Sequence, residues 1–135
     1  MPASVTRTLQ LDLISADGAA TPLSADLRYD RHDPYAVTAC FHSGDAQVQW
    51  VFARDLLTEG IYDPSGDGDV HVWPSIDAVG GAATFIELSS PDGEALIQAR
   101  TDELWDFLAR TEVLVPSGTE SGHLDVDMAL SHIFA

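Results

Sequence analysis

One short segment of the sequence has the residue types and spacing of a calcium-binding loop. Within residues 63–69, Asp63, Ser65, Asp67 and Gly68 occupy the first, third, fifth and sixth positions of an EF-hand loop. Short oxygen ligands surround Ca²⁺ at such positions, and the glycine makes the sharp turn. The twelfth position, which requires a bidentate glutamate, is Pro74. An acidic surface turn is therefore the favoured interpretation, and a calcium site is the alternative.

The residues that could bind zinc or act as nucleophiles show no supporting spacing. No HExxH motif and no i, i+4 pair occurs among the histidines, which are His32, His42, His71, His123 and His132. Cys40 is the single cysteine, so one chain can build neither a disulfide nor a thiolate cluster. Residues 118–122 fail the spacing of a nucleophile elbow because the serine is displaced by one position. We expect no catalytic, cofactor-binding or metal-binding residues, and no enzymatic activity.

Six aromatic residues could form a stacking platform for single-stranded nucleic acid. They are Trp50, Trp73, Trp105, Phe41, Phe52 and Phe85. Base stacking gives little affinity without a cationic groove. The chain has 6 Lys and Arg residues, all of them arginine, against 22 Asp and Glu residues, which gives a net charge of −16. Core packing is therefore the favoured role of these aromatics, and nucleic acid is not an expected partner.

The length and composition predict one folded domain over residues 1–135. A chain of 135 residues with 45% hydrophobic and 21% charged residues has ordinary globular composition and is long enough for a single core. No window approaches the roughly 18 consecutive apolar residues of a membrane span, and the first residues do not resemble a signal peptide. The expectation is a soluble, cytoplasmic protein with no direct membrane insertion.

Alternating apolar and polar residues predict most of the secondary structure as strands. In the first half, strands are expected over residues 5–14, 23–29, 36–42 and 47–52, and the last two form a hairpin. In the second half, a strand over 70–73 that Pro74 ends is followed by a hairpin of 82–88 and 94–99. Residues 63–69 are expected to be turn throughout.

Helices are expected at three places. A short helix over residues 54–60 is closed by Gly60 in the left-handed conformation, and a second over 102–111 has Thr101 as its N-cap. A last helix, which Asp125 could cap, presents Met128, Leu130 and Ile133. The predicted fold class is α+β, with mostly antiparallel curved sheets of about seven strands, a short helix and two C-terminal helices.

Ordered motifs run through nearly the whole chain and carry a family resemblance. They are LRYD (27–30), DPYAV (33–37), FH (41–42), WVFARDLLTEG (50–60), GDGDVHVWP (66–74), LSSPDGEAL (88–96), FLART (107–111), VPSGTE (115–120) and LSHI (130–133). The chain resembles the SsgA-like proteins, a family of actinobacterial sporulation and cell-division proteins.

The resemblance implies a Whirly-like sheet fold assembled as a homotrimer. It also implies a non-enzymatic regulator of sporulation-specific cell division that marks septum sites and recruits the tubulin-like protein FtsZ during septation. Another SsgA-like protein or a membrane-associated division protein is a further partner that it suggests. Two alternatives stay open, which are a single-stranded nucleic-acid-binding Whirly-type domain and a small-molecule-binding protein.

The predicted partner interface is a four-residue apolar patch made of Leu56, Leu57, Ile61 and Tyr62. Bulk charge attraction cannot bring an acidic recruiter to an acidic partner, so the contact should be apolar with a polar rim. The patch lies in a connection between two expected strands, and connections are usually at the surface. Tyr62 is the central candidate because tyrosine is enriched at binding hot spots. Leu56 or Leu57 could instead anchor the turn to the sheet.

Overall fold

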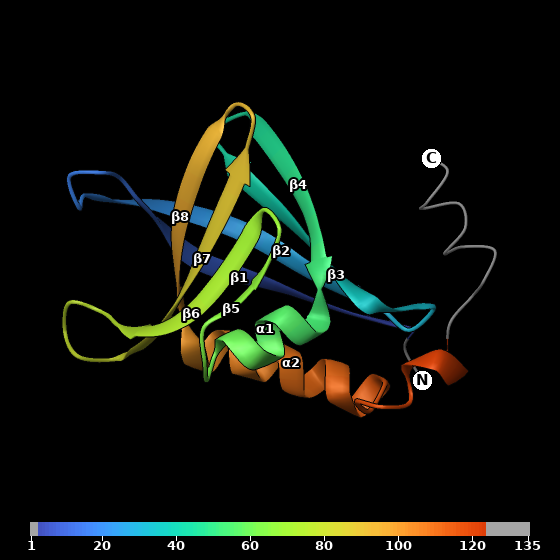
Figure 1. The fold of residues 1–135 in the computed structure, drawn as a ribbon. Coiled ribbons are helices and arrows are strands. Elements are labelled where there is room, and N and C mark those ends of the chain that lie inside the picture. The colour runs from blue at the N-terminus through green and yellow to red at the C-terminus, as the bar shows by residue number, and fades with distance from the viewer. Residues whose placement is uncertain (1–2, 124–135) are drawn as a thin grey trace.

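The computed structural model describes residues 3–123, in which eight antiparallel strands form one strongly curved sheet with two α-helices at one end (Figure 1). The strands are β1 (Ser4–Ile14), β2 (Ala20–Asp30), β3 (Asp33–Ser43), β4 (Ala46–Ala53), β5 (Ser65–Asp67), β6 (Val70–Ile76), β7 (Ala82–Ser90) and β8 (Gly93–Arg100). The helices are α1 (Arg54–Gly60) and α2 (Thr101–Leu114), and a 3₁₀ turn, η1 (Glu120–Gly122), follows.

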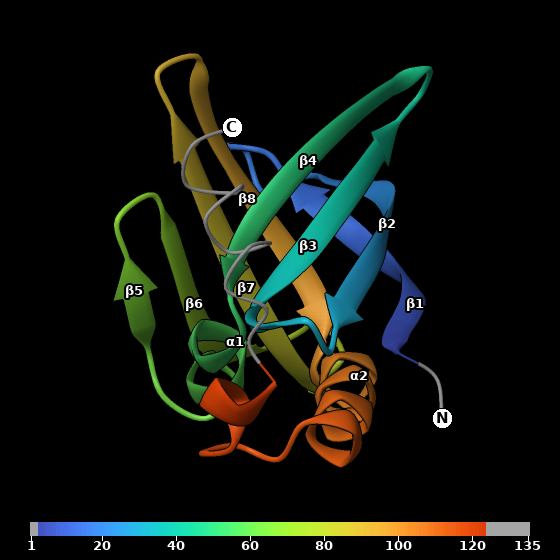
Figure 2. The same cartoon turned by 90° about the vertical axis from the view of Figure 1, so that its right-hand side faces the viewer.

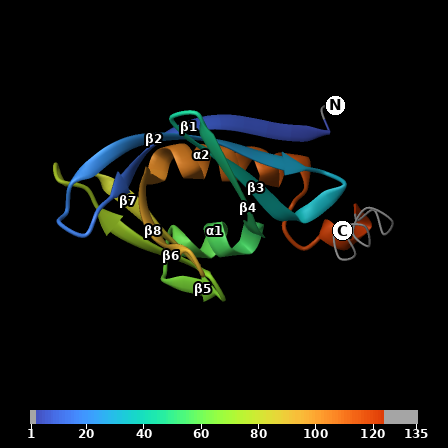
Figure 3. The ribbon, with the colours of Figure 1, turned by 90° about the horizontal axis from the view of Figure 1, so that it is seen from above.

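The sheet consists of two four-stranded halves that β1 joins. The strand order is β4-β3-β2-β1-β8-β7-β6-β5, so each half is a set of consecutive hairpins. β1 pairs with β2 along its full length and with β8 only over its last residues, where Leu13 lies opposite Ile97. The short second pairing lets the two halves diverge. Seen from above, the sheet therefore curls around an interior (Figure 3).

Both helices close the same end of this half-barrel. α1 connects β4 to β5 and contacts β3, β5 and β6, whereas α2 follows β8 and contacts β1, β7 and β8. The hairpins β3–β4 and β7–β8 extend away from the helices on the opposite side (Figure 2). Neither helix within residues 3–123 has the length and apolar composition that crossing a bilayer requires.

The core lies between the concave face of the sheet and the helices. Alternate residues of the strands point inward, as the alternating pattern predicts, and α2 adds side chains spaced along one helical face. Each fully buried large apolar side chain contributes about 1.5–3 kcal/mol through removal from water. The largest buried apolar side chains include Leu9, Tyr29, Val37, Leu57, Val72, Ile97, Leu104, Phe107 and Val115.

The predicted fold class is confirmed, with eight strands instead of about seven. The additional strand is β5, which forms within the segment predicted to be turn throughout and pairs with Val70–Val72. Pro74 does not end β6, which continues to Ile76. This is possible because β5 pairs with β6 only up to Val72, so β6 has one neighbour at Pro74 and the missing N–H is tolerated.

Both helices in the described residues are confirmed: α1 has the predicted bounds, whereas α2 is longer than the predicted 102–111 at both ends. Gly60 has no positive φ angle; it is glycine because a Cβ there would overlap the side chain of Val72 on β6. Thr101 is the first residue of α2, and its hydroxyl hydrogen-bonds to the Thr84 hydroxyl (2.9 Å) instead of capping the helix. The third predicted helix, with Asp125, lies outside the described residues.

Candidate docking site between the two helices

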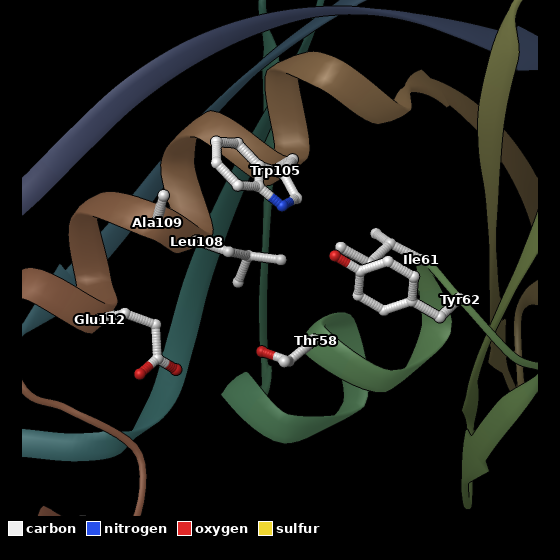
Figure 4. Close-up of a pocket in the computed structure, with 7 residues that line it drawn as sticks. All are labelled: Thr58, Ile61, Tyr62, Trp105, Leu108, Ala109 and Glu112. Carbon is white, nitrogen blue, oxygen red and sulfur yellow. The ribbon is translucent and has the colours of Figure 1, made fainter.

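The helices α1 and α2 lie next to each other at one end of the sheet (Figure 1). An open groove lies between them (Figure 4). Its volume is about 350 Å³. Seven residues line it, which are Thr58, Ile61, Tyr62, Trp105, Leu108, Ala109 and Glu112. Most of these side chains are apolar, and Glu112 is the one with a charge. A shallow apolar groove of this size suits a few side chains of another protein better than a polar small molecule, which needs several convergent polar groups.

Two exposed aromatic side chains stand on opposite sides of the groove. Tyr62 is 65% exposed and Trp105 is 54% exposed. Figure 4 shows the Trp105 indole projecting from α2 toward the side on which the Tyr62 ring lies. The buried side chains of Ile61 and Leu108 lie beneath them. Because Leu108 follows Trp105 by three positions, both belong to the same face of α2.

The structure changes the predicted four-residue patch. Leu56, Leu57 and Ile61 are only 5%, 0% and 6% exposed and belong to the core, so they do not form an exposed surface as expected. The reason is that α1 packs its apolar face against the sheet and α2 instead of lying on the outside. Tyr62 is the one member of the patch that is exposed. Trp105, which was not predicted as a partner contact, faces the same groove.

A buried arginine fixes α1 against α2. Arg54 is the first residue of α1 and is 1% exposed. Its Nη1 donates hydrogen bonds to the carbonyl oxygens of Val115 (2.8 Å) and Thr111 (3.2 Å), at the C-terminal end of α2. The positive charge at this position also interacts favourably with the negative, C-terminal end of the α2 dipole. Arg54 therefore sets the spacing between the helices that form the groove.

The surroundings of Arg54 are charged and aromatic. Its Nη2 lies 3.7 Å from Oε2 of Glu120, and its Nη1 lies 3.9 Å from Oε1 of Glu112. The guanidinium carbon is 4.9 Å from the centre of the Tyr29 ring, within the range of a cation–π interaction. Within the described part of the chain, Nε and Nη2 of Arg54 make no hydrogen bond. One guanidinium between two carboxylates leaves this cluster with a net negative charge.

Two pKa values are shifted in this cluster. The pKa of Glu120 is lowered, first by a hydrogen bond from its own backbone N–H and further by the Gly118 N–H and the charge of Arg54, against the effect of burial. Burial raises the pKa of Tyr29 to about 12, and its hydroxyl donates a 2.8 Å hydrogen bond to the carbonyl oxygen of Pro34. Both shifts favour the protonation states found at neutral pH, a charged Glu120 and a neutral Tyr29.

The charged end of the groove is held by a turn after α2. Oε2 of Glu112 accepts a hydrogen bond from the backbone N–H of Ser117 (2.8 Å), and Oε1 accepts one from the Ser117 hydroxyl. The Glu112 side chain is still 36% exposed. This carboxylate is therefore fixed in place but accessible from the groove.

The segment with calcium-loop spacing has a different local structure. Residues Ser65–Asp67 form β5, and the Ser65 hydroxyl donates to Oε2 of Glu59 (3.2 Å). Among residues 3–123, no three His, Cys, Asp or Glu side chains are grouped in a way that could hold a metal ion.

A polar line of side chains crosses three strands on the sheet. Asp26 accepts a hydrogen bond from the hydroxyl of Thr8 (2.5 Å) and contacts Nε2 of His42 (3.0 Å). The pKa of Asp26 is lowered, chiefly by Thr8 and then by His42. Because the carboxylate is the acceptor for both neighbours, His42 is not placed to activate the Thr8 hydroxyl as a nucleophile.

The aromatic residues considered as a stacking platform do not share one surface. Phe41 and Phe52 are buried in the core. Trp73 packs against Phe85 with ring centres 5.7 Å apart, whereas Trp105 belongs to α2 and not to the sheet.

Little in the sequence indicates that Arg54 and Trp105 are functional residues. The acceptors of Arg54 lie 57 and 61 residues further along the chain, so no local pattern reports the contact. The spacing of Trp105 with Leu104 and Leu108 puts it on the apolar face of a helix, which favours the core-packing role expected for it. One available signal was the acidic Glu112 on the same face, seven positions after Trp105, which is unusual for a wholly buried stripe.

Comparison with known proteins defines the class. The family model described as "Streptomyces sporulation and cell division protein, SsgA" matches residues 23–120. This chain belongs to that family of sporulation and cell-division proteins, as the sequence motifs predict.

Individual relatives show where the chain lies within this family. The chain is 51% identical to the sporulation-specific cell division protein SsgB of Streptomyces coelicolor, over 100% of this chain and 98% of that protein. It is 46% identical to SsgB of Thermobifida fusca, over 95% of this chain and 93% of that protein. The motifs also predict that the chain is nearest to the SsgB branch of the family, and these identities confirm it.

Solved structures show the same fold. An SsgA-like sporulation-specific cell division protein from Thermobifida fusca matches with a TM-score of 0.85 and 46% identity, covering 96% of this chain and 94% of that chain. A structure from work on SsgB mutations and longitudinal cell division during sporulation of Streptomyces coelicolor matches with a TM-score of 0.86 and 49% identity. It covers 90% of this chain and 95% of that chain.

Proposed function

We propose that this cell-division protein is a non-enzymatic adaptor that marks septum sites in the cytoplasm and recruits FtsZ during septation. The observation that carries the proposal is the pair of exposed aromatic side chains, Tyr62 and Trp105, on an apolar groove of a strongly acidic chain. The names of its SsgB relatives as sporulation-specific cell division proteins support the cellular role.

The groove has the features of a protein-binding hot spot. Exposed Tyr and Trp side chains supply large apolar contact areas at a small entropic cost, and both residue types are enriched at such sites. The buried Arg54 contacts hold the two helices in place, so little ordering is required when a partner binds. A docking surface of this kind functions without a catalytic group or a cofactor.

The proposal is tested by capture of purified FtsZ on the full chain. Tyr62→Ala should weaken capture about 30-fold, because truncation of a hot-spot residue typically costs about 2 kcal/mol. The melting temperature and the oligomer mass should stay nearly unchanged, since Tyr62 is exposed.

Tyr35→Ala is the matched control. Tyr35 is also an exposed tyrosine, 47% exposed, but it lies on β3 and does not line the groove. Equal capture by the wild-type chain and by Tyr62→Ala would mean that FtsZ binds elsewhere. Absence of capture by the wild-type chain would contradict recruitment by direct contact.

We also propose that the protein assembles as a homotrimer with a Whirly-like fold. The sheet has two open edges, β4 and β5, and β4 has no charged residue in its eight positions. Copies that each carry −16 repel one another, so they should meet at uncharged surfaces. Light scattering should give three times the chain mass at both low and high salt, and a monomer mass at micromolar concentrations would contradict this.

Recruitment to one position in the cell needs a second contact. For this we propose another SsgA-like protein or a membrane-associated division protein, which would also be identified by capture on the full chain. Nucleic acid is not part of the proposal, because the chain has six arginines and five of them are paired with carboxylates.

A further inference from the structure

We infer that the groove between α1 and α2 recognises a short basic and apolar segment of its partner. One large apolar side chain of that segment enters between Tyr62 and Trp105, and an adjacent arginine or lysine binds Glu112. The inference rests on the proposed function in taking the groove as the partner contact. It adds the chemistry by which the partner segment is selected.

The apolar part of the recognition follows from the shape and lining of the groove. Its volume of about 350 Å³ is small, and its base is formed by Ile61 and Leu108. The rings of Tyr62 and Trp105 flank this base, as Figure 4 shows. A leucine, methionine or phenylalanine side chain placed there would cover the base and contact both rings. An entire helix would require a longer apolar surface, so the fitting unit is a single anchor residue.

The basic part follows from the position of Glu112. Its carboxylate lies at one end of the groove and is held by two donors of Ser117. A carboxylate has about four acceptor positions, so Ser117 leaves capacity for another donor. Arg54 does not neutralise this end, because it is shared with the buried Glu120. A guanidinium from the partner would form a charge-assisted hydrogen bond with a preorganised acceptor.

The charges on the two helices that border the groove are mostly negative. α1 and α2 together contain six acidic residues, which are Asp55, Glu59, Asp102, Glu103, Asp106 and Glu112. Their two basic residues are Arg54, which is buried, and Arg110, whose Nε lies 3.3 Å from Oδ2 of Asp106. Exposed Asp55 precedes Thr58 by three positions and so belongs to the face of α1 that borders the groove. Exposed Asp102 precedes Trp105 by three positions in the same way, and its Oδ2 lies 3.5 Å from Nη2 of Arg100.

This charge pattern selects among the possible occupants. A second copy of the chain would bring its own excess of carboxylates to the acidic rim, and an acidic peptide would do the same. A purely apolar peptide would partly desolvate Glu112 without bringing it a cation beyond the shared Arg54, which is unfavourable. The occupant that satisfies both the apolar base and the acidic rim carries an apolar anchor next to a positive charge.

The experiment is a selection of random short peptides on the immobilised full chain, with sequencing of the enriched peptides. We expect enrichment of an aliphatic or aromatic residue next to arginine or lysine. For a synthetic peptide of the enriched sequence, Trp105→Ala should raise the dissociation constant at least tenfold. Glu112→Gln should raise it several-fold at low salt, with a smaller effect at high salt, because screening weakens the charge contribution.

Two variants serve as matched controls. Tyr35→Ala removes an exposed aromatic side chain outside the groove, and Glu94→Gln removes an exposed carboxylate at the β7–β8 turn. Both should leave the dissociation constant unchanged. Melting temperatures of all variants show whether a loss of binding comes from a loss of folding.

Several results would overturn the inference. These are the absence of enrichment, enrichment of acidic peptides, or equal binding to the wild-type chain and Trp105→Ala. A smaller oligomer mass for Trp105→Ala would show that the groove is an interface between copies, which also overturns it. Capture of FtsZ separates the two proposals. If the wild-type chain captures FtsZ and Trp105→Ala and Glu112→Gln capture it equally well, the inference alone is contradicted. Groove-bound basic peptides without any capture of FtsZ contradict the proposed function alone.

Discussion

The guanidinium of Arg54 donates a 2.8 Å hydrogen bond to the carbonyl oxygen of Val115, 61 residues further along the chain. The contact joins the first residue of α1 to the residue that follows α2. The two walls of the groove are therefore connected through one buried side chain. Stability and the geometry of the docking site depend on the same interaction.

Arg54→Met should strongly destabilise the fold. Methionine fills much of the volume of the arginine stem but removes the charge, so the buried Glu120 loses its cationic neighbour. Removing one partner of a buried pair typically costs about 3–5 kcal/mol. Urea unfolding followed by circular dichroism measures the change in the free energy of unfolding.

Arg28→Met is the control for this substitution. The Arg28 side chain is 58% exposed, so the same change should alter the free energy of unfolding by less than about 0.5 kcal/mol. The double variant Arg54→Met, Glu120→Gln should recover part of the loss, because it also removes the unpaired carboxylate. Equal stability of Arg54→Met and Arg28→Met would show that the buried pair does not hold the helices.

Gly60→Ala tests the close approach of α1 to β6. A Cβ at Gly60 would overlap the side chain of Val72, which is fully buried and cannot move freely. We expect a loss of about 1–3 kcal/mol from this overpacking. Gly122→Ala, with no atom within 4 Å of the added Cβ and no positive φ, should be nearly neutral in the same urea titration. A neutral Gly60→Ala would contradict the tight packing.

The role of Gly60 illustrates what sequence patterns could and could not predict. A glycine at the end of a short helical segment correctly predicted the last residue of the helix. The same glycine was expected to adopt a left-handed conformation, whereas the structure requires it for contact with β6. That contact is with Val72, 12 positions further along the chain on β6, and local residue propensities carry no information about it. The strands were predicted more reliably because alternation is a local signal, and β1, β7 and β8 match it closely.

Leu57→Ala and Tyr62→Ala should separate the core from the surface within the predicted patch. Leu57 is 0% exposed and Tyr62 is 65% exposed. Truncation of a buried leucine typically costs about 2–5 kcal/mol, whereas an exposed position changes stability by about 0.5 kcal/mol or less. Thermal unfolding of the two variants, side by side, measures this difference. Similar melting temperatures for both would mean that α1 is not packed as described.

The patch also shows why exposure was hard to predict. A helical connection between two strands could lie outside the sheet or cover an open end of it, and the sequence of α1 is compatible with both. Which of these two positions α1 takes depends on the curvature of the eight-stranded sheet, whose halves leave one end open for both helices. Tyr62 was identified correctly as exposed because it follows the helix at a turn, where a polar hydroxyl reaches water.

Acid should selectively remove the contribution of Glu120. The pKa of Glu120 is lower in the folded chain than its ordinary value of 4.5, because backbone N–H groups and Arg54 favour the charged form. Its stabilisation is therefore complete above about pH 4.5 and is lost as the pH falls through the folded value. Urea titrations from neutral pH to pH 3 should show the difference between the wild-type chain and Glu120→Gln shrinking below pH 4.5. A constant difference would contradict the shift.

At alkaline pH the raised pKa of Tyr29 should make the free energy of unfolding fall as the pH rises, the opposite direction to the effect of Glu120. Burial raises its pKa from 10.0 to about 12, so the folded chain holds the phenol proton more tightly than the unfolded chain does. The stabilisation is complete below about pH 10 and is lost as the pH rises toward 12. The free energy of unfolding, measured in urea between pH 8 and pH 11.5, should therefore fall more steeply for the wild-type chain than for Tyr29→Phe. Tyr29→Phe should also be about 1 kcal/mol less stable at pH 8, because it lacks the hydrogen bond to Pro34. Parallel curves for the two chains would show that the Tyr29 hydroxyl titrates as it does in the unfolded state.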